Sequence, residues 1–272
     1  MKLIMDDSTK MFQEMLQKIE QTKADFKLNL IDKYDEYRVA LEKTQVKLKD
    51  KILELNTANP SWFEKKDIRI YVVIKLLSLV SSTKLGILEN KLFVLKENWP
   101  DLFFEDVVPK NILIDIGQVG YIKELDTTLR FAYFQRMFSN YEAFVKMLAL
   151  ACPAGTTNDY KGFVTQYLKL KKDDDNFLNI LKWVRNSIHN NGIHIPDDSK
   201  HDNKTFTYKA KQIEFRKFHW VDVSWQDVIN LVDDLIDLSF QIIDDKKIQG
   251  VEYIEDIVER KRKVFNKPTE LN

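Results

Sequence analysis

Apolar residues recur at helical spacing along the first fifth of the chain. The segment from Asp7 to Asn59 has no glycine or proline, and its apolar positions fall at steps of three, four or seven: Phe12, Leu16, Ile19, Phe26, Leu30, Tyr37, Leu41, Leu48, Ile52 and Leu55. This period predicts one long amphipathic helix or two in series. Polar residues interrupt the apolar seam, so the helix either lies along its own domain or a partner, or pairs as a coiled coil.

A second helix is expected after Pro60. Ser61 and Glu64 have the spacing of a capping box, which predicts a helix from Ser61 to about Ser82. The run from Ile70 to Ile74 is rich in β-branched residues and is also compatible with a strand.

Glycine and proline are concentrated between residues 100 and 120. This region is the best candidate for a domain junction. We therefore expect an N-terminal helical region over residues 1–118 and a helical bundle over residues 119–272.

The second half of the chain predicts further helices and one break in the helical pattern. Apolar periodicity predicts a central helix from Tyr121 to Ala151, a short helix ending near Leu170, a helix from Asp173 to the turn Asn190-Asn191-Gly192, a helix from Ser224 to Gly250, and a last amphipathic segment from Val251 to Phe265. Alternating residues predict a small β-hairpin or irregular insertion between Thr205 and Val223. The fold class expected is therefore mainly α, a helical bundle with a long N-terminal helical region.

Composition narrows the class of protein. With 42 basic and 42 acidic residues, 44% hydrophobic residues and one cysteine, the chain is neither disordered nor disulfide-stapled, and we expect a water-soluble protein. Early acids argue against a secretory signal, and the longest apolar stretch, Ile70 to Val80, is shorter than a bilayer needs. We expect a cytoplasmic protein without membrane contact. Cys152 follows an apolar run and is interpreted as a buried, unreactive residue.

Candidate chemistry is concentrated near the end of the helix before Gly192. Arg185 and His189 are four residues apart and share a helix face, with Asn186 and Asn190 close by. Arginine offers a planar charged fork for phosphate oxygens, and histidine exchanges a proton near neutral pH. In RNA the 2′-hydroxyl is an internal nucleophile, so a base, an acid and charge stabilisation suffice for cleavage. The pair therefore suits a ribonuclease that uses no metal and no cofactor. No motif for binding a metal or a cofactor is evident in the sequence.

This motif resembles that of the HEPN family of small helical bundles. Members are typically dimeric, and many are metal-independent ribonucleases of toxin–antitoxin and antiviral-defence systems. Their arginine, polar residue and histidine correspond to Arg185, Asn186 and His189, and an acidic residue of an earlier helix corresponds to Glu142. The resemblance covers roughly residues 121–243 and implies catalytic roles for the first three residues, with Glu142 and Asn190 in support.

The spacing in this chain departs from the family pattern. Members usually have four to six residues between arginine and histidine, whereas three separate Arg185 from His189. Each residue step turns a side chain by about 100° around the helix. A non-catalytic member with the same fold is therefore an alternative, as is a purely structural role in which both side chains stabilise the helix C-terminus.

Two functions remain open from sequence. The first is an endoribonuclease that acts as a homodimer through the helix ending at Gly192, because the net charge is zero and a phosphate site would need positive charge from two chains. The second is a sensor or adaptor that binds a protein partner through its N-terminal helix. Two other histidines, His194 and His201, lie among aspartates, but a solvated loop is the simpler interpretation and no metal site is expected.

Overall fold

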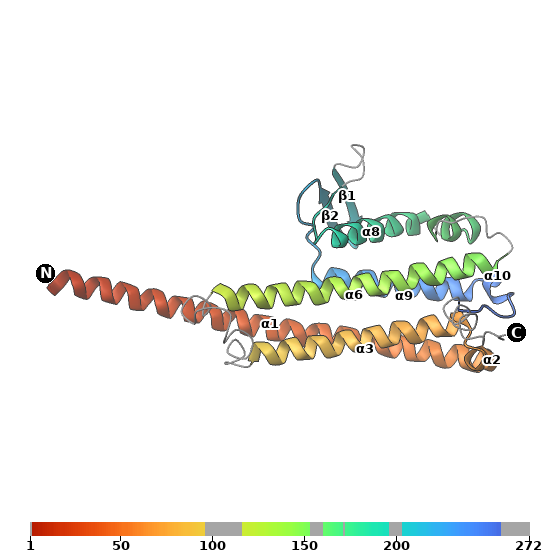
Figure 1. Cartoon of the computed structure of the whole chain (residues 1–272), viewed down its shortest axis with the longest axis horizontal. Helices are drawn as coiled ribbons and strands as arrows, with labels where there is room; N and C mark the ends of the chain where they lie inside the picture. Colours follow the sequence, from red (N-terminus) through yellow and green to blue (C-terminus); the bar gives the residue numbers. More distant parts are fainter. Residues whose placement is uncertain (1, 96–115, 153–159, 171, 196–202, 257–272) are drawn as a thin grey trace, which may run out of the picture. The chain divides into compact units, whose positions relative to one another are not determined.

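The computed structural model is built almost entirely of helices (Figure 1). It describes residues 2–95, 116–152, 160–170, 172–195 and 203–256. The long helices are α1 (Lys2–Ala58), α3 (Ile68–Leu95), α6 (Ile116–Ala151), α8 (Lys172–His189) and α9 (Trp225–Asp244). The short ones are α2 (Pro60–Glu64), α7 (Tyr160–Gly162), the π-helix η1 (Phe163–Tyr167) and α10 (Lys246–Gln249). The mainly α prediction is confirmed.

The predicted hairpin is present as two antiparallel strands. Strand β1 (Asn203–Tyr208) pairs with β2 (Lys211–Arg216), with Phe206 opposite Ile213. Both of these side chains are buried. The two turn residues, Lys209 and Ala210, both have positive φ. Two-residue turns with this backbone conformation match the right-handed twist of the strands that they join.

The prediction of a single helix over residues 61–82 is wrong. Pro60 occupies the first turn, Asn59 is the N-cap, and no side chain caps the helix, so the Ser61 capping box does not form. Helix α2 ends after one turn, and Lys66 takes a positive φ before α3 begins. Helix α3 then passes Gly86 and ends at Leu95, and the β-rich run inside it is helical.

Two C-terminal boundaries also differ from the prediction. Helix α9 ends at Asp244 rather than at Gly250, because Asp245 adopts an extended backbone and its side chain caps α10. Residues 251–256 are not helical, so the predicted amphipathic segment does not begin there. Its remainder, including the basic run 260–263, lies outside the described residues, as do residues 157–159 and most of the glycine- and proline-rich region. Gly117 and Gly120 lie within α6.

The chain forms two compact units, each assembled from separate segments. The first comprises residues 1–40 and 83–129, and the second comprises residues 41–82 and 130–272. The two units are defined by which segments pack together. They do not test the predicted domain boundary at residue 118, which stays a prediction. The hairpin, α9 and the Arg185 motif, by which we mean Arg185, Asn186, His189 and Asn190, all belong to the second unit.

A buried ion pair joins distant segments within the second unit. Arg69 and Asp67 are both fully buried, with 2.7 Å between Nη2 and Oδ2. Arg69 also donates to the backbone carbonyls of Ile248 and Val251, and its guanidinium lies 3.6 Å from the centroid of the Trp62 ring. These contacts hold the start of α3 against α10 and the segment that follows it.

Helix α3 is the most apolar helix among the described residues. Its segment Ile68–Leu92 is long and apolar enough to cross a membrane, and 44% of the most apolar window is buried inside the protein. Val72, Val73 and Val80 are core residues with almost no exposed surface. Core helices of water-soluble proteins also meet this criterion of length and composition, and a water-soluble protein remains the expectation.

Candidate functional site

Helices α6 and α8 contact each other in antiparallel register across the Arg185 motif (Figure 1). Along α6, the contacting residues Phe131, Gln135, Phe138 and Glu142 recur at steps of four, three and four, which places them on one face. Along α8 and its C-terminal turn, the matching residues are Arg185, His189 and Gly192. Arg185 and His189 therefore face the same neighbouring helix, as their spacing predicts.

Arg185 forms a long ion pair with Glu142, without a hydrogen bond between the two side chains. Its Nη2 is 3.6 Å from Glu142 Oε2, a distance that makes an ion pair but exceeds a hydrogen bond. Glu142 also pairs with Lys146 at 3.0 Å, and the Arg185 guanidinium lies 5.7 Å from the Phe138 ring centroid. The Arg185 Nε is buried and has no hydrogen-bond partner among the described residues. The side chain as a whole is 31% exposed, so its Nη donors, rather than the buried Nε, are the ones that an oxyanion can reach.

His189 is the last residue of α8 and is exposed to solvent. Its Nε2 lies 3.4 Å from Nε2 of Gln135, whose own Oε1 is buried without a partner. The two ends of the Gln135 amide have the same shape, so either end can face the ring. An amide can donate to an unprotonated ring nitrogen or, turned over, accept from a protonated one. Gln135 can therefore accompany both proton states of His189.

The two asparagines of the motif lie at the end of the helix. Asn190 donates from its side chain to the backbone carbonyl of Asn186 at 3.0 Å, which caps the last turn. Asn191 and Gly192 then take positive φ, and the Gly192 amide donates to the Ser187 carbonyl. This is the left-handed C-terminal turn that the sequence predicts. Asn190 serves the helix end here, and the role of the Asn186 side chain stays a prediction.

Sequence reasoning missed two neighbours of the motif. Gln135 lies on the same face of α6 as Glu142, and this spacing could have identified it once the pairing of the helices was known. Trp220 follows the hairpin and is 65% exposed. Its ring packs beside Gly192, in the turn that follows α8. This contact joins residues far apart in the chain, so no pattern in the neighbouring sequence could have revealed it.

His194 is not part of a solvated loop. It is buried and stacks on Trp183 with 4.8 Å between ring centroids, and it packs edge-on against Phe215. His201 and the aspartates considered with it lie outside the described residues. Cys152 is buried, as predicted, and burial raises the pKa of its thiol.

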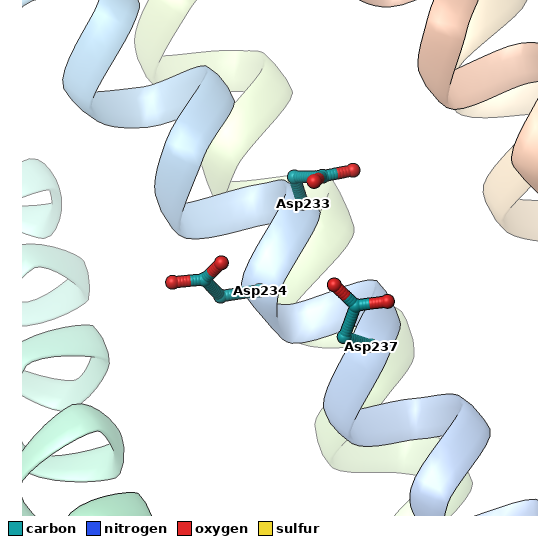
Figure 2. A group of neighbouring side chains, drawn as sticks. All are labelled: Asp233, Asp234 and Asp237. Atoms are coloured by element: carbon teal, nitrogen blue, oxygen red, sulfur yellow. The ribbon is translucent and has the colours of Figure 1, made fainter.

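Three carboxylates on α9 come close together, as Figure 2 shows. Asp233 and Asp237 both bind Lys47, at 3.1 and 2.6 Å. Asp234 points away from Asp233 in Figure 2 and accepts from the Tyr208 hydroxyl and from Lys209. Burial and this bond to Asp234 raise the pKa of Tyr208. Because lysines and a tyrosine already engage these carboxylates, we assign no metal site to them.

A cavity of about 500 Å³ lies between α8, the hairpin and α9. Its lining mixes rings (Phe177, Tyr208), amides (Asn176, Gln241) and carboxylates (Asp234, Asp237). The rings of Phe177 and Tyr208 stack on each other with 6.1 Å between centroids. This mixture favours no single class of ligand, so the Arg185 and His189 pair remains the stronger candidate.

Comparison with protein-family models, with curated proteins and with solved structures found no match to this chain. The resemblance to the HEPN family therefore rests on the residues of the motif, and the arrangement of Arg185, His189, Glu142 and Gln135 is what bears on function.

Proposed function

We propose that this chain is a metal-independent endoribonuclease of the toxin or antiviral-defence type, cytoplasmic and active as a homodimer. One observation carries the proposal: Arg185 and His189 lie on one face of α8, with His189 exposed and Arg185 only loosely paired with Glu142. An exposed proton-exchanging ring one turn from a partly available guanidinium is suited to a phosphodiester.

Each residue has a defined role in the reaction. His189 removes the proton from the 2′-hydroxyl, the 2′-oxygen attacks phosphorus, and the 5′-oxygen leaves with a proton, so that a 2′,3′-cyclic phosphate remains. Arg185 holds the non-bridging oxygens as negative charge builds on them. Glu142 positions Arg185, and Asn186 orients His189 or the phosphate.

The chemistry favours two copies of the chain. Cleavage needs a group that takes the 2′-hydroxyl proton and a positive charge that holds the phosphate, and this motif supplies one histidine and one arginine in each chain. Two copies of α8 meeting across a two-fold axis would form two sites, each with the histidine of one chain and the arginine of its partner, and water gives the leaving 5′-oxygen its proton. A chain of net charge zero also gains from pooling its local positive charge.

Subunit complementation tests the composite site. We expect the separate variants Arg185→Ala and His189→Ala to be inactive, and a mixture of the two, unfolded and refolded together, to recover roughly a quarter of wild-type cleavage. The estimate follows from random pairing, in which about half the dimers are mixed and one of their two sites keeps both residues. Cleavage is measured on a labelled single-stranded RNA, and the control is each variant refolded alone.

The mixture gives no recovery if each site draws both residues from a single chain. A dimer held only through residues 7–59, with the two motifs apart, would likewise contradict the composite site. Cross-linking at Asn191, exposed at the end of α8, reports which helix lies at the dimer contact.

The alternative function, a non-catalytic sensor or adaptor, has an observation of its own. Leu85, Leu88, Leu92 and Leu95 recur at steps of three, four and three along α3, and all four are exposed. Val46 and Leu53 on α1 are exposed as well. Exposed apolar side chains at helical spacing are typical of a helix that binds a partner protein. An inactive chain that captures a protein through these helices would favour this function.

A further inference from the structure

A largely exposed strip of basic and aromatic residues begins at the last residue of β2 and continues beyond the hairpin. It comprises Arg216, Lys217, Phe218, His219 and Trp220, which we call the aromatic strip. Phe218 is 67% exposed and Trp220 is 65% exposed, the most exposed aromatic side chains in the part of the chain that the structure describes. Neither ring is used by the core.

The backbone presents these rings in a fixed conformation. Phe218 has φ of 59°, which is uncommon for a bulky residue, and its amide donates to the His194 carbonyl at 2.8 Å. The His194 amide donates in turn to the His219 carbonyl at 3.0 Å, and the Val221 amide donates to the Gly192 carbonyl at 2.9 Å. Three hydrogen bonds therefore hold the strip against the residues that follow α8, although its rings point to solvent.

Trp220 adjoins the Arg185 motif directly. A Cβ at Gly192 would lie 2.7 Å from Cζ3 of Trp220 and 3.1 Å from Cε2 of Phe131. Gly192 comes three residues after His189, and Phe131 is one helical turn from Gln135, the residue that contacts His189. The edge of the indole thus packs beside the motif while most of its surface stays open.

We propose that Trp220 is a stacking platform for an unpaired base of single-stranded RNA, next to the phosphate held by Arg185 and His189. This inference rests on the proposed function, for which it specifies an unpaired substrate. Bases of single strands stack on exposed aromatic rings, and a duplex offers no free base face for this. Arg216 begins the turn whose central residues are Lys217 and Phe218, closed by the His219 amide donating to the Arg216 carbonyl. Lys217 supplies positive charge beside the ring for the adjoining phosphates, and Arg216 pairs with Glu214 at 2.9 Å at the edge of the strip.

The cations favour a nucleic acid over a protein partner for this surface. A protein-binding patch is depleted of lysine and continuous in its apolar area. In the strip, each exposed ring instead has a basic or histidine neighbour in the sequence, and the Lys217 ammonium lies 5.5 Å from the Phe218 ring centroid. Aromatic rings combined with positive charge are the recurring composition of surfaces that bind single strands.

Binding to a non-cleavable strand tests the platform independently of catalysis. The probe is a fluorescein-labelled oligouridylate with 2′-O-methyl groups, compared with the same strand annealed to its complement. We expect Trp220→Ala to weaken single-strand binding by on the order of 10-fold, and Trp220→Phe to stay within about 3-fold of wild type because a ring remains. Phe63→Ala, which removes an exposed ring outside the strip, should bind as wild type does.

Intrinsic fluorescence provides a second readout that needs no alanine variant. The single strand should quench part of the tryptophan emission of the wild type, and Trp220→Phe should lose that part.

Equal binding by wild type and Trp220→Ala, with equal quenching in Trp220→Phe, overturns the inference even if RNA is cleaved. Trp220-dependent binding by a wild type that cleaves no RNA overturns the proposed function and leaves the platform standing. Conversion of the dimer to a monomer by Trp220→Ala would assign the strip to an interface between copies and overturn the inference.

Discussion

His189→Ala is expected to reduce RNA cleavage by about 10²-fold or more, the usual size of a lost acid–base contribution. The melting temperature should hardly change, because His189 is exposed and its side chain contacts only Gln135 among the described residues. Arg185→Lys keeps the positive charge but loses the planar fork, so it should also impair cleavage. The measurement is cleavage of a labelled RNA beside thermal unfolding, with Lys182→Ala, an exposed change on α8, as the matched control.

The same two variants separate chemistry from helix capping. Arg185 and His189 lie in the last turns of α8, where cations stabilise the C-terminal carbonyls. If both variants chiefly lower the melting temperature, and the wild type cleaves no RNA, the residues stabilise the helix end and the ribonuclease proposal is wrong.

Asp67→Ala is expected to destabilise the fold by about 3–5 kcal/mol, because it leaves the buried guanidinium of Arg69 without its counter-ion. Asp67 also accepts hydrogen bonds from the backbone amides of Arg69 and Ile254, which would lose their partners. Chemical denaturation with urea measures the change in the free energy of unfolding.

Two further variants give this prediction its controls. Glu214→Ala breaks the exposed pair with Arg216 and should cost less than about 1 kcal/mol. The double variant Asp67→Ala/Arg69→Met removes both charges and should be more stable than Asp67→Ala alone. A loss below about 1 kcal/mol for Asp67→Ala would show that this buried pair does not hold the two segments together.

Helices with a strong local period could be predicted from sequence. Helix α1 and most of α6 follow long stretches without glycine or proline, and their apolar positions recur at helical steps. The turn after α8 could also be predicted, because asparagine and glycine readily take positive φ. In each of these segments the residues that determine the structure are near one another in the chain.

Boundaries set by distant contacts could not be predicted. The break between α2 and α3 is accompanied by a bridge from Asp67 to Glu255, and Arg69 is held by one carbonyl in α10 and one that follows it. A capping-box pattern at Ser61 carries no information about those partners. His194 was misjudged for the same reason, since its burial depends on Trp183 and Phe215.

In the candidate site, too, some residues could be predicted from local spacing and others depend on tertiary packing. The spacing of Arg185 and His189 placed both on one face of α8, and the family resemblance suggested Glu142, which the structure brings within 3.6 Å of Arg185. Gln135 and Trp220 depend on how α6 and the segment after the hairpin pack against α8. Local spacing could not reveal these two residues.

The most direct test of metal-independent RNA cleavage is to incubate the wild type with single-stranded RNA in excess EDTA, beside the same sequence carrying 2′-O-methyl groups throughout. Attack by the 2′-oxygen predicts that the RNA is cut into products ending in a 2′,3′-cyclic or 3′-phosphate and that the methylated strand stays intact. His189→Ala should cut neither strand at a comparable rate. Cleavage that stops in EDTA, or that proceeds equally on the methylated strand, would contradict the proposed chemistry.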